Sequence, residues 1–166
     1  MQCFFSIYRP IFILRINFNE SYENLMQFAF TNVIQMQLLV KESTAITPSI
    51  CFDGKTGVME IKGRSIPDQP DEFWLPVLSW FESYLLNPQP KTRVSIDLEY
   101  FNISSSKRIL FLLYKLNELV DSGKEAEVEW CYRQSDEDMF EVGQDYAYMV
   151  KVPFIFNEYK DIALAI

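Results

Sequence analysis

The strongest constraint on the fold lies in residues 93–120, where the spacing of apolar residues changes. Residues 93–100 alternate between polar and apolar, which predicts a β-strand whose core side carries Val94, Ile96, Leu98 and Tyr100. In residues 109–120 the apolar positions follow the helical period, which predicts an amphipathic helix. The sequence therefore predicts a strand, a short polar loop and a helix, and such loops carry the working sites of open α/β sheets.

The loop before this helix is rich in side chains that can accept hydrogen bonds. Asn102, Ser104 and Ser105 are residue types that cap helix N-termini, because their oxygens accept free backbone N–H groups. Two interpretations stay open. Capping alone accounts for these residues, whereas a phosphate on one of the hydroxyls would lie at the positive end of the helix dipole and change a docking surface.

The rest of the chain predicts a small α/β domain. We expect further strands at 49–53, 58–63, 125–133 and 153–156, and helices at 71–87 and from Ser135 onward. Asp71 is the expected cap of the first helix. The order β-β-α-β-α-β-α-β describes helices on a mixed sheet, with a hairpin first and parallel strands around each helix.

The two ends of the chain differ from this pattern. Residues 1–35 have no coherent period, and we expect an extension that is disordered or that precedes a translation start at Met36, the alternative being an extra element packed on the domain. Residues 158–166 are expected to form a tail. The apolar stretches near the N-terminus are short and interrupted by charge, so neither a membrane span nor a signal peptide is predicted.

Composition excludes several classes of chemistry. The 166 residues contain no histidine, which removes Ser-His-Asp and Cys-His catalysis and His-ligated metals. A net charge of −8 argues against nucleic acid or an anionic membrane as partner. Cys3, Cys51 and Cys131 have no zinc spacing, and we expect buried, reduced thiols in a cytoplasmic protein.

Two patterns resemble sites by their letters alone. Residues 104–107 fit S-x-x-K and residues 55–57 fit K-T-G, but their order is reversed relative to serine β-lactamases and S-D-N is missing, so chance explains them. The acids of 136–138 and Glu141 lie on one predicted helical turn and do not converge as a metal site requires. We therefore expect no enzyme, no metal and no cofactor.

The segment Asp97–Lys107, which reads DLEYFNISSSK, resembles the SiaC family of bacterial regulatory phosphoproteins. Further resemblance lies in residues 47–50, 63–67, 80–85 and 128–132, and together these cover residues 44–157. The resemblance implies a fold similar to STAS domains and anti-sigma-factor antagonists, and no enzymatic activity.

In that family, the threonine directly after the loop asparagine is phosphorylated by a Ser/Thr kinase and dephosphorylated by a SpoIIE-type phosphatase. The unphosphorylated form binds and activates a diguanylate cyclase. Here the position after Asn102 is Ile103, which cannot carry phosphate. Either the switch has moved to Ser104 or Ser105, or this chain is locked in its partner-binding state.

The leading hypothesis is a non-catalytic partner-switching regulator that binds and activates a diguanylate cyclase or a similar signalling protein. Its expected docking residues are Asp97, Glu99, Tyr100, Phe101, Asn102, Ile103, Ser104 and Ser105. The alternative is a STAS-like module that holds a small molecule or an anion at the helix N-terminus. The sequence predicts neither the particular partner nor the oligomeric state.

Overall fold

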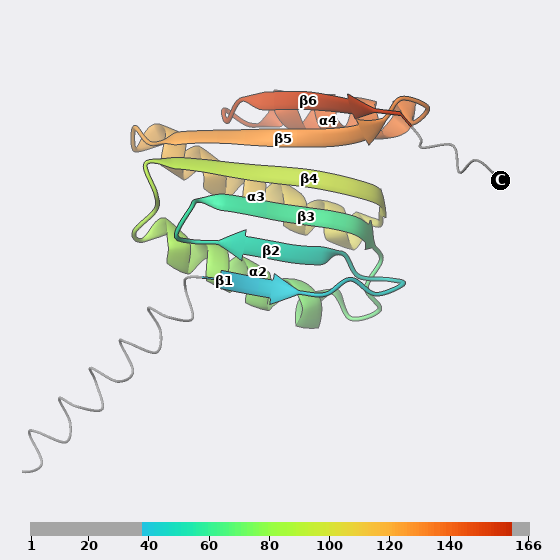
Figure 1. The fold of residues 1–166 in the computed structure, drawn as a ribbon, viewed down its shortest axis with the longest axis horizontal. Coiled ribbons are helices and arrows are strands. Elements are labelled where there is room, and N and C mark those ends of the chain that lie inside the picture. The colour runs from blue at the N-terminus through green and yellow to red at the C-terminus, as the bar shows by residue number, and fades with distance from the viewer. Residues whose placement is uncertain (1–37, 161–166) are drawn as a thin grey trace, which may run out of the picture. The chain divides into compact units, whose positions relative to one another are not determined.

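The structure is a computed structural model that describes residues 38–160, and there it forms one mixed sheet with helices on a single face (Figure 1). Six strands follow one another in spatial order as they do along the chain: β1 (Leu38–Lys41), β2 (Ser49–Asp53), β3 (Val58–Ser65), β4 (Lys91–Phe101), β5 (Glu125–Arg133) and β6 (Phe154–Tyr159). Three helices in this range, α2 (Pro70–Leu85), α3 (Ile103–Asp121) and α4 (Glu137–Met149), lie on the same side of the sheet.

The pairing of the strands confirms the predicted mixed sheet. β1, β2 and β3 are antiparallel neighbours, so the expected hairpin is present. β3, β4, β5 and β6 are parallel, with one helix between each successive pair, as the predicted crossovers require. The first two parallel crossovers place the central strand β4 between β3 and β5.

The element order differs from the prediction at its start. β1 precedes the expected first strand and pairs with β2, Leu39 opposite Phe52. It was missed because Leu38–Val40 is an uninterrupted apolar run without the alternation that indicates a strand. Figure 1 shows it at the edge of the sheet, where pairing with a single neighbour positions it.

Several element boundaries also differ, and two of them correct a prediction about a cap or about the tail. The first helix begins at Pro70 with Gln69 at the cap position and no side-chain capping bond, so the expected cap at Asp71 is wrong. Proline at the first turn suits a helix start, because its missing N–H has no intrahelical partner there. The last strand runs to Tyr159 and so enters the segment that we expected to begin the tail. The expectations for residues 1–35 lie outside the described residues.

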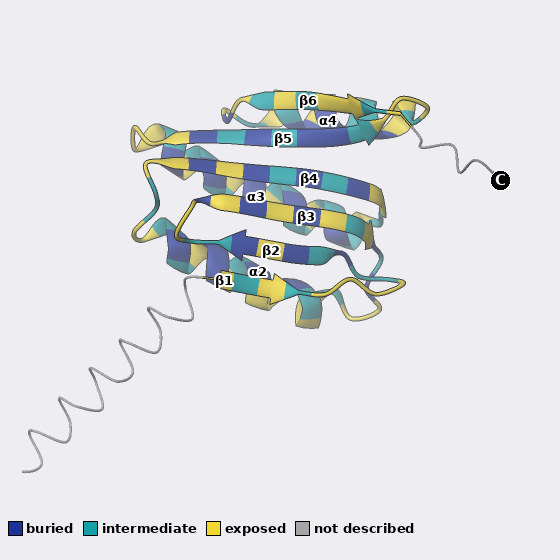
Figure 2. Ribbon diagram, viewed as in Figure 1, coloured by how far each residue is buried: buried dark blue, intermediate teal, exposed yellow. Residues whose placement is uncertain are grey.

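The core lies between the sheet and the helices. Buried and exposed positions alternate along β2, β3, β4 and β5, as Figure 2 shows. The predicted core face of α3 is confirmed, since Ile109, Leu112, Leu113, Leu116 and Leu119 are buried. One side of α4 is buried as well, at Met139, Gly143 and Tyr146. None of the helices in the described part of the chain combines the length and the apolar character that crossing a membrane requires.

The two cysteines in the described range lie in different surroundings. Cys131 is buried, as predicted, and burial raises the pKa of its thiol. Cys51 is exposed, which corrects the prediction. Its neighbours Ile50 and Phe52 both face the core, and because side chains alternate along a strand, Cys51 must face the opposite side of the sheet.

Candidate functional site

A β-bulge near the end of β4 determines which side chains are exposed to solvent there. Leu98 pairs with Gly63, and the next pair is Tyr100 with Arg64, so one residue of β4, Glu99, has no partner. Gly63 has a φ of 105°, which glycine adopts without the strain that a Cβ would bring. The extra residue reverses the alternation beyond Leu98.

The consequence corrects the prediction for Tyr100. Its side chain is 53% exposed instead of facing the core, and the Arg64 guanidinium lies 5.8 Å from its ring centre. Phe101 takes the core side instead and packs against Trp130 and Tyr146. Of the two aromatic residues that we assigned to docking, Tyr100 is therefore the accessible one.

Asn102 caps α3 as predicted. Its Oδ1 accepts the backbone N–H of Ser105 at 2.9 Å, which satisfies one of the free donors of the first turn. Its own N–H donates to the carbonyl oxygen of Ser65 at 3.0 Å. These two bonds tie the loop to the end of β3 and fix where the helix begins.

The serines of the first turn differ sharply in accessibility. Ser105 is fully buried, and its Oγ accepts bonds from Ser65 Oγ at 2.7 Å and from the Trp74 indole at 3.3 Å. Ser106 Oγ lies 2.6 Å from the Tyr146 hydroxyl, and burial raises the pKa of that phenol. Ser104 is only half-buried. The first turn of α3 is thus anchored to α2 through Ser105 and to α4 through Ser106.

Ile103 is the most exposed side chain of this turn. It is the first residue of α3, and 74% of it is accessible to solvent. An isoleucine at a helix start contributes nothing to capping. The turn therefore presents an apolar side chain next to a rigid, capped loop.

The predicted acidic members of the site lie apart from this turn. Asp97 projects from the sheet face opposite the helices, where Lys62 Nζ at 2.9 Å and the Tyr159 hydroxyl at 2.9 Å bind its carboxylate. The hydrogen bond from Lys62 to Asp97 raises the pKa of Lys62. Glu99 lies at the bulge, 3.9 Å from Arg133 Nη2. The structure therefore groups Tyr100–Ser105 and leaves Asp97 in contacts on the open sheet face.

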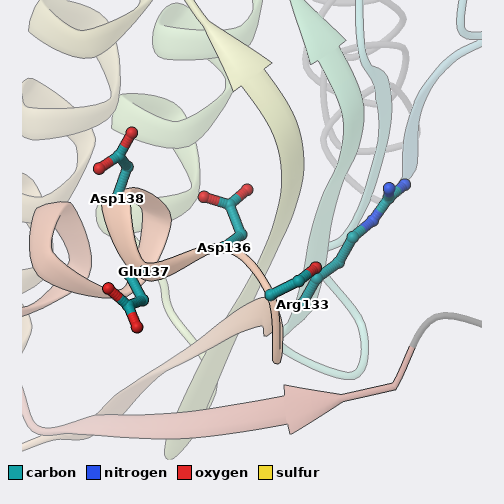
Figure 3. Close-up of a pocket in the computed structure, with 5 residues that line it drawn as sticks. Arg133, Asp136, Glu137 and Asp138 are labelled. Carbon is teal, nitrogen blue, oxygen red and sulfur yellow. The ribbon is translucent and has the colours of Figure 1, made fainter.

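A pocket of about 340 Å³ lies at the turn between β5 and α4, lined by Arg133, Ser135, Asp136, Glu137 and Asp138. Asp136 Oδ1 caps α4 by accepting the N–H of Met139 at 3.0 Å. Figure 3 shows the Glu137 carboxylate pointing away from the separate carboxylates of Asp136 and Asp138, and Arg133 extending away from all three. Carboxylates that do not converge cannot complete the coordination of a hard cation. Within residues 38–160, no group of three or more Cys, Asp or Glu side chains is placed to hold a metal ion.

The contacts that hold the site were not predicted. Ser65 and Trp74 lie 40 and 31 residues from Ser105, and Tyr146 lies 40 residues from Ser106. No local pattern in the sequence connects residues at such separations. The capping role of Asn102 could be predicted, because a helix cap and the backbone N–H that it accepts lie within the same turn.

Fold and site together define a small α/β domain whose accessible feature is a capped strand-to-helix loop with an exposed isoleucine. A match to the model of the SiaC family of regulatory phosphoproteins extends over residues 41–159. The chain belongs to this family, as the resemblance in the sequence indicates.

Relatives and solved structures agree with this assignment. An uncharacterized protein of Pseudomonas aeruginosa (strain UCBPP-PA14) is 26% identical over 118 residues, which cover 71% of this chain and 94% of the relative. The P. aeruginosa structure of the diguanylate cyclase SiaD in complex with its activator SiaC matches with a TM-score of 0.70 and 26% identity, covering 73% of this chain and 99% of that one. Apo-SiaC from P. aeruginosa matches with a TM-score of 0.67 and 26% identity, covering 72% and 98%.

Proposed function

We propose that this chain is a non-catalytic regulator that binds a diguanylate cyclase and activates it. The observation that carries the proposal is its similarity to SiaC, an activator solved in complex with the cyclase SiaD, over 99% of the matched chain. Its membership of a regulatory family supports the same reading. The proposed contribution of the chain is therefore a protein surface, and the reaction belongs to the partner.

The docking surface begins at the loop Tyr100–Ser105 and the first turn of α3. Tyr100 and Ile103 are both exposed there. Burial of such side chains on association stabilises a complex by roughly 25 cal/mol per Å² of apolar surface, less the costs of ordering. The bonds of Asn102 hold the loop in one conformation, so little ordering is needed on docking.

The proposed regulation depends on the residue at position 103, which is isoleucine. It stands at the family's phosphothreonine position and lacks a hydroxyl, so no phosphate at this position can interfere with binding of the partner. Phosphorylation of Ser105 would require its buried hydroxyl to leave Ser65 and Trp74. Ser104, which is half-buried, is the remaining candidate for a Ser/Thr kinase and its SpoIIE-type phosphatase.

The alternative of an anion site at the start of α3 receives less support. Asn102 already accepts the N–H of Ser105, and the N–H of Ser106 donates to the carbonyl oxygen of Asn102. Anion binding relies on such N–H groups being available. The capped turn therefore favours a protein partner over an anion.

The test is reconstitution of purified full-length chain with the diguanylate cyclases of its source organism. We expect a complex by size-exclusion chromatography and faster formation of cyclic di-GMP from GTP. Ile103→Asp should weaken both, because a charge would be buried in an apolar contact. Val58→Asp, at a 50% exposed position on the open sheet face, is the matched control. Absence of a complex with every cyclase, with no change in rate, would contradict the proposal.

A further inference from the structure

β6 is an edge strand whose outer side is open. No strand within residues 38–160 pairs with that side, because β6 is the last strand in the order of the sheet (Figure 1). The segment Phe154–Tyr159 contains no proline, lysine or bulge, the features that commonly protect an edge strand from further pairing. β1, at the opposite edge, is only four residues long and includes Lys41. β6 is therefore the edge better suited to accept another strand.

The bonds of β6 to β5 show which of its backbone groups point outward. The carbonyl oxygen of Pro153 accepts the N–H of Val128 at 2.9 Å. At the other end of β6, the carbonyl oxygen of Tyr159 accepts the N–H of Gln134 at 2.9 Å. Backbone groups alternate in direction along a strand, so the residues between these two that point to the open side are the even-numbered ones. They are Phe154, Phe156 and Glu158.

Partly buried aromatic side chains line the helix side of this edge. Phe156 is paired with Trp130 and shares its face of the sheet, and the Phe156 ring centre lies 5.4 Å from that of Phe140 in α4. Phe154 lies on the same face, with its ring centre 6.0 Å from that of Phe156. All three phenylalanines keep part of their surface accessible to solvent. A strand added to β6 would cover these rings, and burial of apolar surface favours association.

Acidic side chains lie beside the aromatic edge. Glu137 is exposed and precedes Phe140 by three residues, which places both on the same side of α4. Glu158 is exposed at the end of β6, where its carboxylate accepts a hydrogen bond of 3.5 Å from the Tyr132 hydroxyl. Neither carboxylate forms an ion pair within residues 38–160. A cationic side chain on a partner would complement both.

We propose that β6 binds an extended segment of a protein partner, which adds another strand to the sheet. Apolar side chains of that segment cover Phe154 and Phe156, and a lysine or arginine lies beside Glu137 and Glu158. Strand addition takes its affinity from main-chain hydrogen bonds and its specificity from alternate side chains. A second copy of this chain fits less well, since it brings the same acids and a net charge of −8 to the edge. This surface shares no residue with the loop Tyr100–Ser105, so the inference does not depend on the cyclase.

Two synthetic peptides test the edge of β6 in the full-length chain. Their sequences, TVTVTKT and the reverse TKTVTVT, place valines and one lysine on the same side of a strand and cover both chain directions. Hydrogen exchange followed by NMR should show slower exchange of the outward amides of β6 when a peptide binds, and little change at Ile155 and Asn157, which face β5. Methylation of alternate peptide nitrogens should weaken binding by about tenfold or more in one of the two phases only, because only one phase donates to β6.

Variants of the chain separate the backbone from the charge. Glu158→Pro removes an outward N–H without removing a bond to β5, and it should weaken binding more than Glu158→Ala, which loses the same charge and keeps the N–H. Glu137→Lys should weaken binding of the lysine peptides severalfold through repulsion. Asp145→Lys makes the same change at an exposed residue on the far side of α4 from Phe140, and should bind within about twofold of wild type. Melting temperatures identify any variant that has lost its fold.

Several results would overturn the inference. Failure of both peptides to bind, or equal weakening by both phases of methylation, would show that β6 does not accept a strand. Slower exchange confined to β1 would assign the binding to the opposite edge of the sheet. A dimer in analytical ultracentrifugation that protects the same amides without peptide would assign the edge to a second copy of this chain.

Discussion

Gly143 is the position where a single added methyl group should test the packing of α4 most directly. At this residue α4 packs closely against Trp130 of β5. A Cβ built on Gly143 would lie only 2.5 Å from Trp130 Nε1 and 2.6 Å from Trp130 Cδ1. Trp130 is fully buried, and its indole N–H donates to the carbonyl oxygen of Met139 at 2.9 Å. Gly143→Ala therefore forces either the indole or the helix to move.

The expected magnitude follows from three contributions. Overpacking of a buried site costs about 1–3 kcal/mol. Displacement of the indole from Met139 costs about 1 kcal/mol more when that hydrogen bond is lost. Alanine in a helix is more favourable than glycine by about 1 kcal/mol. The net loss in the free energy of unfolding is then about 1–3 kcal/mol, or about 4–12 °C in melting temperature for a domain of this size.

Urea and thermal unfolding followed by circular dichroism measure this change. Gln144→Ala is the matched control, since this exposed residue follows Gly143 in the same helix and its replacement should be nearly neutral. A Gly143→Ala protein as stable as wild type would show that α4 lies farther from β5 than the structure has it, and the reasoning would fail.

Three further predictions concern the core, the site and pH. Leu112→Ala should cost about 2–5 kcal/mol in urea unfolding because Leu112 is fully buried, whereas Lys115→Ala, whose ion pairs are at the surface, should stay within about 0.5 kcal/mol; equal losses would mean that the core face of α3 is misassigned. If the proposed Ser/Thr kinase acts on this loop, Ile103→Thr should gain one phosphate in intact-mass analysis after treatment with it, and in the natural chain any phosphate should map to Ser104; phosphate found only elsewhere would contradict the switch hypothesis. Burial raises the pKa of Tyr146 above its ordinary value of 10.0, so above about pH 10 the folded state keeps a proton that the unfolded state loses, and stability should fall with rising pH; Tyr146→Phe should flatten this dependence, and an unchanged slope would count against it.

Local patterns of the sequence predict much of the fold. Alternation along residues 93–100 and the helical period of 109–120 predicted β4 and α3, because burial of one face of an element imposes its period on the sequence. The cap at Asn102 was equally local, since its partner Ser105 lies in the same turn. The family motif around Ile103 also belongs to one continuous segment.

The tertiary structure decided the features that depend on distant partners. The bulge opposite Gly63 turns the Tyr100 side chain toward solvent. The alternation of polar and apolar residues in β4 does not indicate this shift of register against β3. Ser105 looked as accessible as Ser104 in the sequence, but packing against Ser65 and Trp74 buries only Ser105. Periodicity reports which face of an element is covered, whereas the register between elements and the side chains that meet across them arise only when the chain is folded.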